Sequence, residues 1–385
     1  FQAEDGIRDA QESRGLGDVY KRQLQERLSL IKQVGEEIIN EEELNKLLTS
    51  GQELIAYDGF EPSGQIHIAQ GLLRTININK MIKAGIKFKI LIADWHALAN
   101  NKLGGDLSKI QTVGKYFIEV WRACGMNLDK VEFIWASDIT KSQDYWQLVL
   151  QVGRSNALRR FIRTAEMMGR AESLDNLTGA NIIYSCMQVA DIFTLKANIT
   201  QLGVDQRKIN MLAREIGSAL GYWKPVVVSH HMLRGLGKPP TTKDDKITQV
   251  IQLKMSKSKP DSAIFITDTL ADITKKINKA YCLEGDIYDN PILEYCRYII
   301  FESFERLGID SWLIERPLKW GGNLKVRTYA QLEQLFANKQ IHPQDLKVAV
   351  IKALDKLLAP IRQYFVKNPQ AKKLLEKIKN YNITR

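Results

Sequence analysis

Two short polar segments of the chain carry groups that suit phosphate chemistry. The first, at 67–71, reads His-Ile-Ala-Gln-Gly and follows a predicted buried strand at 54–57 and a turn-rich loop at 58–64. A strand, a glycine-bearing loop and a helix start place N–H groups and a positive helix end where a triphosphate can lie. An imidazole donor at His67 would hydrogen-bond phosphate oxygens there. Packing of this histidine at a strand-to-helix corner is the alternative that the segment alone leaves open.

The second segment reads Lys-Met-Ser-Lys-Ser at 254–258, within a predicted mobile loop over about 233–262 whose first part is rich in Gly, Pro and charge. The ammonium groups of Lys254 and Lys257 on a closing loop would stabilise charge that develops on an α-phosphate and a departing pyrophosphate. A solvated Lys/Ser loop is the alternative. The two segments together favour a nucleotide site.

A third set of polar side chains interrupts the apolar segment 182–191. Tyr184, Gln188 and Asp191 stand at i, i+4 and i+7, so a helix places them on one face. Buried polar groups cost stability unless they have partners, and this stripe therefore predicts a pocket for a polar ligand. A self-satisfied core network is the alternative.

The elements that must position these groups alternate between strand and helix. Apolar residues from Leu28 to Ile39 recur at helical spacing, and 145–179 also reads as helical. Such alternation implies a doubly wound parallel sheet with ligand at the carboxyl ends of its strands, where Tyr57, His67 and Asp94 fall. Neither a GxGxxG nor a GxxxxGK[ST] motif is present. Further strands are predicted at 88–94 and 131–135, and further helices at 41–43, 76–84 and 110–124.

Composition supports an ordinary globular protein of about two domains, with 385 residues, 44% of them hydrophobic. We expect no transmembrane helix, because no run of about 18 uncharged apolar residues occurs, and no secretory signal. The four cysteines lack CxxC spacing, which predicts reduced thiols and a cytoplasmic location. With five histidines and no His/Cys cluster, no structural metal site is predicted.

Charge and sequence bias mark the two ends of the chain. Of the formal net charge of +11, a surplus of 14 − 4 = +10 lies between Lys319 and Arg385. A basic terminal module predicts a polyanionic partner, with a merely solvated basic face as the alternative. Residues 1–23 are polar, without apolar periodicity and without an initiating methionine, so we expect a non-native or disordered extension there.

From about Leu24 to its end the chain resembles the tyrosyl-tRNA synthetases of the eukaryotic and archaeal type, which are class I aminoacyl-tRNA synthetases. The segments at 67–71 and 254–258 look like the HIGH and KMSKS signatures of that class. The resemblance is specific because its motifs are long and occur in order. The other matching segments are 57–64, Tyr184 with Gln188 and Asp191, 203–208, 319–323 and 342–347.

The resemblance implies a Rossmann-like catalytic domain at 24–265, with a helical insertion at about 120–195, followed by a mainly α-helical anticodon-binding domain at 266–385. It implies tyrosine binding by Tyr57 and Asp191 at the hydroxyl and by Tyr184, Gln188 and Gln206 at the α-amino group. It implies catalysis by His67, Gln70, Lys254 and Lys257, and ATP binding by these four together with Gly59, Asp205, Met255 and Ser256. Trp320 and His342 would stack on the first anticodon base, and Asp345 would accept from a guanine edge.

The activity implied is a two-step ligation of L-tyrosine to tRNA(Tyr) through tyrosyl adenylate, with ATP as substrate and Mg²⁺ on its phosphates. A homodimer formed through the helical insertion, and no editing domain, are further expectations of the resemblance. Two residues depart from the family pattern: Gln70 replaces the second histidine of HIGH, and Trp95 stands where many relatives have leucine. A tryptophanyl-tRNA synthetase and a catalytically silent RNA-binding relative are the alternatives.

Overall fold

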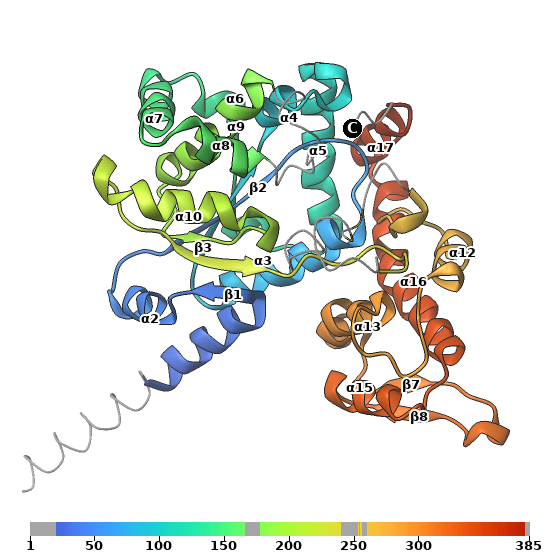
Figure 1. Cartoon of the computed structure of the whole chain (residues 1–385). Helices are drawn as coiled ribbons and strands as arrows, with labels where there is room; N and C mark the ends of the chain where they lie inside the picture. Colours follow the sequence, from blue (N-terminus) through green and yellow to red (C-terminus); the bar gives the residue numbers. More distant parts are fainter. Residues whose placement is uncertain (1–20, 166–177, 240–252, 254, 256–259, 382–385) are drawn as a thin grey trace, which may run out of the picture.

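The main sheet has six strands in the order β1-β6-β5-β2-β3-β4. The computed structural model describes residues 21–165, 178–239, 253, 255 and 260–381 (Figure 1). Only the pair β1–β6 is antiparallel, so the doubly wound parallel sheet expected from the sequence is confirmed. The strands are β1 (Gly35–Ile39), β2 (Ile55–Phe60), β3 (Lys87–Ile92), β4 (Val131–Trp135), β5 (Ile199–Thr200) and β6 (Val226–His230).

Helices cover both faces of this sheet, and each face has its own apolar core. Along β3, Phe88, Ile90 and Ile92 enter the core shared with α3 and α5, whereas Leu91 enters the core shared with α7, α9 and α10. Near-continuous apolar strands are typical of parallel sheets buried on both faces. A helix at 21–34 precedes β1, and the others are α2 (Glu41–Thr49), α3 (Arg74–Lys83), α4 (Asp94–Ala99), α5 (Leu107–Ala123), α6 (Ala136–Ile139), α7 (Gln143–Arg154), α8 (Leu158–Ala165), α9 (Gly179–Thr194) and α10 (Arg207–Ile216).

Several predicted elements have other bounds in the structure; the strand predicted at 88–94, for example, ends at Ile92, and Asp94 begins α4. Two of the differences come from strand pairing. Ile38 and Ile39 belong to β1, where they pair with Val228 and Val227, and not to the preceding helix. Strand β2 continues through Asp58 to Phe60, which the sequence had assigned to a loop, because β3 pairs with it along its whole length. In both places strand pairing with a distant segment outweighs the local sequence preference.

The region at 145–179, expected to be helical, contains most of α7 and all of α8, while 166–177 lies outside the described residues. Helix α9 is buried on nearly every side, and a capping box between Thr178 and Asn181 fixes its first turn. The helix therefore holds Tyr184, Gln188 and Asp191 in a rigid frame.

The C-terminal part is mainly helical, with one antiparallel strand pair, as expected. Its last helix, α17, packs back against α5, so a single apolar core includes residues from both parts (Figure 1). The domain boundary at 265 stays a prediction. The elements are α12 (Leu270–Lys279), α13 (Pro291–Tyr295), α14 (Phe304–Leu307), β7 (Trp312–Ile314), β8 (Leu324–Val326), α15 (Tyr329–Ala337), α16 (Pro343–Lys367) and α17 (Pro369–Lys379).

Candidate functional site

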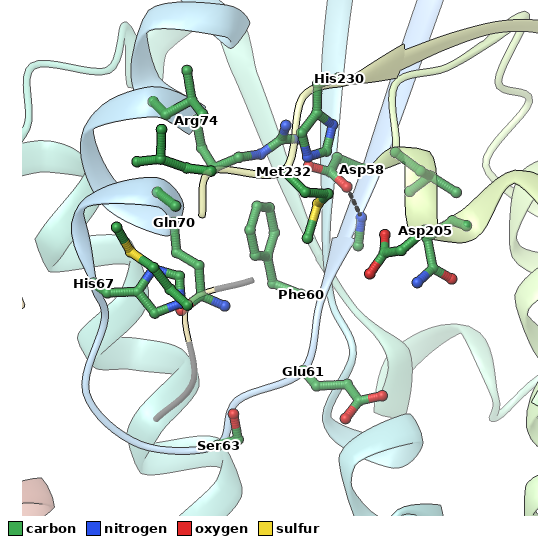
Figure 2. A pocket seen from close by; sticks show the side chains of 18 of the residues that line it. Asp58, Phe60, Glu61, Ser63, His67, Gln70, Arg74, Asp205, His230 and Met232 are labelled. Atoms are coloured by element: carbon green, nitrogen blue, oxygen red, sulfur yellow. Dashed lines mark hydrogen bonds and ion pairs between the residues drawn. The ribbon is translucent and has the colours of Figure 1, made fainter. Parts of the chain in front are cut away.

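A cavity of about 320 Å³ opens at the carboxyl end of β2. One wall comes from β2 and from the loop and turn that lead from β2 into α3. The others come from α9, from the short helical turn at Val204–Gln206, and from the segment after β6 (Figure 2). Side chains far apart in sequence therefore meet here. The predicted site residues that line the cavity are Gly59, His67, Gln70, Tyr184, Gln188, Asp205, Gln206 and Met255.

His67 and Gln70 lie beside each other on one wall of the cavity (Figure 2). A π-helical turn at Ala69–Leu73 carries Gln70, and such turns are frequent at functional sites. The segment around His67 is fixed by a bridge to Phe265 and by a bond of 2.9 Å from Ile68 N to Ile264 O. The chain that follows the Lys-Met-Ser-Lys-Ser segment is thus docked directly on the first motif.

Gly71 makes this close approach of the two segments possible. A Cβ added at Gly71 would lie 2.6 Å from Cδ1 of Ile266, which is closer than carbon atoms can pack. Met255, from the middle of the second motif, is buried and lines the same cavity as His67. Lys254, Ser256 and Lys257 lie outside the described residues.

The opposite wall carries Asp205 (Figure 2), and Gln206 follows it at the end of the short turn that precedes α10. Gln188 Nε2 on α9 donates to Gln206 Oε1 at 3.0 Å, so α9 and this turn are joined at the cavity surface. Gly203 allows the turn to be tight, because a Cβ there would lie 2.5 Å from Asp205 Oδ1. The wall is polar and held in place by its own contacts.

Glu61, which the sequence analysis did not select, is bound to Tyr184. The Tyr184 hydroxyl donates to Glu61 Oε1 at 2.6 Å, and Asn100 Nδ2 donates to the same oxygen at 2.7 Å. Burial, and then the Glu61 carboxylate, raise the pKa of Tyr184 well above its ordinary value. The phenol therefore remains protonated and donates its hydrogen bond to the Glu61 carboxylate.

Tyr57 and Asp191 do not line the cavity but are buried behind it. Asp191 Oδ1 accepts from the Tyr145 hydroxyl at 2.8 Å, and Oδ2 lies 2.9 Å from His96 Nε2. Burial and then the Asp191 carboxylate raise the pKa of Tyr57. Of the polar stripe on α9, Tyr184 and Gln188 thus face the cavity, while Asp191 lies deeper, in contact with Tyr145 and His96. For Asp191 the choice between a ligand pocket and a core network stays open at this point.

His96 lies between Tyr184 at the cavity and the buried Asp191. Its ring makes an edge contact with Tyr184, with the ring centroids 5.0 Å apart, while Nε2 faces Asp191. Burial alone would lower the pKa of His96, but the carboxylates of Asp191, Glu61 and Asp94 together outweigh it and raise this pKa. Neither His96 nor Tyr145 was selected from the sequence, because only the fold brings them to Asp191.

A buried ion pair between Asp58 and Arg74 lies at the inner end of the cavity (Figure 2). Arg74 Nη2 also donates to Gln201 O at 3.2 Å. Burial lowers the pKa of Arg74 to about 9, partly opposed by Asp205. Burial and the neighbouring Arg74 cation hold the pKa of His230 well below its ordinary value, so His230 is a neutral imidazole. This cluster could not be predicted from the sequence, since its members come from four separate segments.

Asp94 and Trp95, also noted in the sequence, do not reach the cavity. Asp94 accepts from the backbone N–H of Ser137 at 2.9 Å and from Gln111 Nε2 at 3.0 Å. Trp95 packs beside Trp146, with the ring centroids 6.1 Å apart. Both residues tie α4 to its neighbours.

The three predicted anticodon residues lie in the C-terminal part. Trp320 is 65% exposed, and His342 is the N-cap of α16, with its Nδ1 accepting from Gln344 N at 3.2 Å. Arg316 connects the segment around Trp320 with the residues just before α16, because its guanidinium donates to both Gly322 O and Gln340 O. An exposed indole thus lies on a loop that is tied to the start of α16, whose first turn contains Asp345.

Within the described ranges, no group of three or more His, Cys, Asp or Glu side chains could hold a metal ion. All four cysteines are free thiols, and Cys282 is the least buried of them. No helix in that part of the chain is long and apolar enough to cross a bilayer.

Comparison with known proteins agrees with this geometry. The family model for class I tRNA synthetases (W and Y) matches residues 49–359. Tyrosine–tRNA ligase 1, cytoplasmic, of Arabidopsis thaliana is 46% identical over 366 residues, which is 94% of this chain and 90% of that protein. The L-tyrosine complex of a tyrosyl-tRNA synthetase from Pyrococcus horikoshii superposes with a TM-score of 0.84 at 38% identity, covering 92% of this chain and 99% of that one.

A tryptophanyl-tRNA synthetase from Aeropyrum pernix K1 is a more distant match. It superposes with a TM-score of 0.66 at 18% identity, covering 90% of this chain and 86% of that one. Identity this low shows a shared fold and nothing about substrate.

Proposed function

Because the chain belongs to the class I tRNA synthetases, and within them to the tyrosine–tRNA ligases, we propose that its cavity joins L-tyrosine to ATP and passes the tyrosyl group to tRNA(Tyr). The observation that carries this proposal is the meeting of His67, Asp205 and Tyr184 around one cavity. His67 and Asp205 would then face the nucleotide, and Tyr184 would face the amino acid.

Tyrosine is selected through its hydroxyl by Tyr57 and Asp191. Asp191 is fully buried and already accepts a bond from Tyr145, yet a carboxylate has about four acceptor sites. A substrate hydroxyl can thus add to the network, donating to Asp191 and accepting from Tyr57. An indole offers a single N–H donor and no acceptor, so this pair suits tyrosine better than tryptophan.

Activation is an in-line attack of the tyrosine carboxylate on the α-phosphate of ATP, which releases pyrophosphate and leaves tyrosyl adenylate. His67, and Gln70 through its amide, bind phosphate oxygens, with Gly59 leaving room for the nucleotide and Asp205 accepting from the ribose. Lys254 and Lys257 stabilise the charge that develops as pyrophosphate departs. Met255 and Ser256, which lie between them, contribute to the ATP site. Mg²⁺ suits such phosphates and prefers to be held by them and by water rather than by an all-protein cage.

Transfer follows when a terminal ribose hydroxyl of the tRNA attacks the activated carbonyl. Trp320 and His342 stack on the first anticodon base, and Asp345 accepts from its edge. The exposure of Trp320 supports this role, because stacking needs an open ring face. The surplus of basic residues after Lys319 supplies phosphate contacts.

We also propose a homodimer that works in the cytoplasm. Apolar side chains are exposed on neighbouring helices of the insertion: Leu150 on α7, Leu158 on α8 and Ile183 on α9 are 73%, 60% and 48% exposed. Such side chains are expected at a protein–protein interface. Light scattering tests this assembly, and a monomer at working concentration would contradict it.

Amino-acid-dependent ATP–pyrophosphate exchange with tyrosine, phenylalanine and tryptophan in parallel tests the function. We expect exchange with tyrosine alone. Exchange with tryptophan would instead identify a tryptophan enzyme, and binding of tRNA without any exchange would identify a silent RNA-binding relative.

A further inference from the structure

We propose that Glu61 supplies the negative charge that binds the α-ammonium group of the substrate, an assignment that rests on the proposed function. The three residues that the family resemblance assigns to this group, Tyr184, Gln188 and Gln206, are all uncharged. An ammonium group taken from water into a cavity needs a compensating charge or it binds weakly.

The position of Glu61 fits this role. It follows β2 directly and lines the cavity, and its side chain lies on the side of the labelled residues away from Arg74 (Figure 2). Its bonds from Tyr184 and Asn100 both end on Oε1. Within the described part of the chain this leaves the lone pairs of Oε2 for a ligand.

The hydrogen-bond directions around Glu61 also suit an ammonium group. A phenol has one O–H, and Tyr184 donates it in a hydrogen bond to Glu61, so the Tyr184 oxygen can only accept from a ligand. Gln188 uses its amide N–H₂ on Gln206, which leaves its carbonyl oxygen as an acceptor. Tyr184 Oη, Gln188 Oε1 and Glu61 Oε2 are thus three acceptors on this wall, and an ammonium group brings three donors.

Glu61 differs from the other carboxylates of the cavity in its partners. Asp58 is paired with the Arg74 cation, and Asp205 lies on the proposed ATP wall. The partners of Glu61, a phenol and an amide, are neutral. These two contacts therefore do not compensate its charge. The charge acts at longer range on His96, whose pKa it helps to raise, and a substrate ammonium group would compensate it directly.

A chain of amides holds Glu61 in this orientation. Asn181 Nδ2 donates to Asn100 Oδ1 at 3.2 Å, and Asn181 Oδ1 accepts from the N–H of Thr178 at 3.1 Å in the cap of α9. Asn100 and Asn181 are both buried. The carboxylate is thus fixed from the end of α4 and the start of α9 before any ligand arrives.

The test is Glu61→Gln in the full chain. Glutamine keeps the volume and an oxygen that accepts from Tyr184 and Asn100, and removes only the charge. Calorimetry gives the dissociation constants of L-tyrosine and of 3-(4-hydroxyphenyl)propanoate, which is tyrosine without its amine. We expect tyrosine binding to weaken by about 10- to 100-fold, the usual range for one charge-assisted hydrogen bond, and the deaminated analogue to bind unchanged.

Glu132→Gln on β4, whose carboxylate pairs with Lys89 away from the cavity, is the matched control and should change neither constant. Equal weakening of tyrosine and its analogue by Glu61→Gln would overturn the proposal, because a distorted wall affects both ligands. Unchanged tyrosine binding would overturn it as well. A wild-type chain without tyrosine-dependent exchange would instead contradict the proposed function.

Discussion

The residues that would select tyrosine and those that would read the anticodon are built in opposite ways. Asp191 is fully buried and bound by Tyr145 and His96 before any substrate is present, whereas Trp320 is 65% exposed on a loop. His342 uses one ring nitrogen to cap α16 and keeps its ring in the open.

This difference follows from what each region must distinguish. Phenylalanine lacks one hydroxyl, and rejecting it requires buried polar groups that are left unpaired when that hydroxyl is missing. A base in a tRNA loop is larger and is recognised by stacking and by its edge, for which an open ring on a rigid support is sufficient. The tyrosine-selecting residues therefore depend on burial, and the anticodon-reading residues depend on exposure to the base.

The largest effect of a substitution is expected at the buried Asp191. Asp191→Asn keeps the volume but removes the charged acceptor, so discrimination between tyrosine and phenylalanine should fall on the order of 10³-fold. Tyrosyl-tRNA synthetases are the known example of this type of selection, with about 10⁵-fold discrimination. The ratio of kcat/KM for the two amino acids in pyrophosphate exchange measures the loss, and an unchanged ratio would remove Asp191 from the hydroxyl site.

A somewhat smaller effect is expected at the reaction centre itself. Lys257→Ala should lower kcat for exchange by about 10²- to 10³-fold, the range found when one donor to a transition state is lost. The dissociation constant of tyrosine should not change, because Lys257 acts on pyrophosphate. Weaker tyrosine binding with normal kcat would show that the lysine serves the amino-acid side.

At the exposed region, Trp320→Ala should raise KM for tRNA(Tyr) by about tenfold, since stacking of one base is worth about 1–3 kcal/mol. Pyrophosphate exchange without tRNA should remain normal, which serves as the internal control. If exchange also falls, the two regions are not independent and the comparison between them fails.

The smallest effect is expected at His96, where two substitutions distinguish a role in positioning Asp191 from a role in packing. His96→Gln retains an N–H donor for Asp191, whereas His96→Met has a similar volume but no donor. We expect the glutamine variant to keep nearly all discrimination against phenylalanine and the methionine variant to lose about tenfold, the cost of one hydrogen bond to a charged group. Cys186→Ala, buried on the same helix as Asp191, controls for lost packing, and equal ratios in both His96 variants would limit His96 to a packing role.

The sequence was sufficient where function imposes a local pattern. His67 with its preceding strand and loop, and Tyr184 with Gln188 on one helix face, could be selected because their spacing is short and regular. The end of β2 could not be predicted, because pairing with β3 decides it. Glu61 was missed for a related reason, since its partner Tyr184 lies 123 residues away and no local pattern reports that contact.

The packing of α17 against α5 has a consequence for how the chain is made. Tyr116 of α5 packs against Phe365 of α16, with tilted rings whose centroids are 5.6 Å apart, and Ala371 and Ile378 of α17 complete the same core. During synthesis this face of α5 stays uncovered until the ribosome has added more than 250 further residues, as the positions of Tyr116 and Ala371 show (371 − 116 = 255). A nascent chain therefore exposes apolar surface for most of its synthesis, which makes prematurely ended chains targets for chaperones and proteases while the finished protein escapes them.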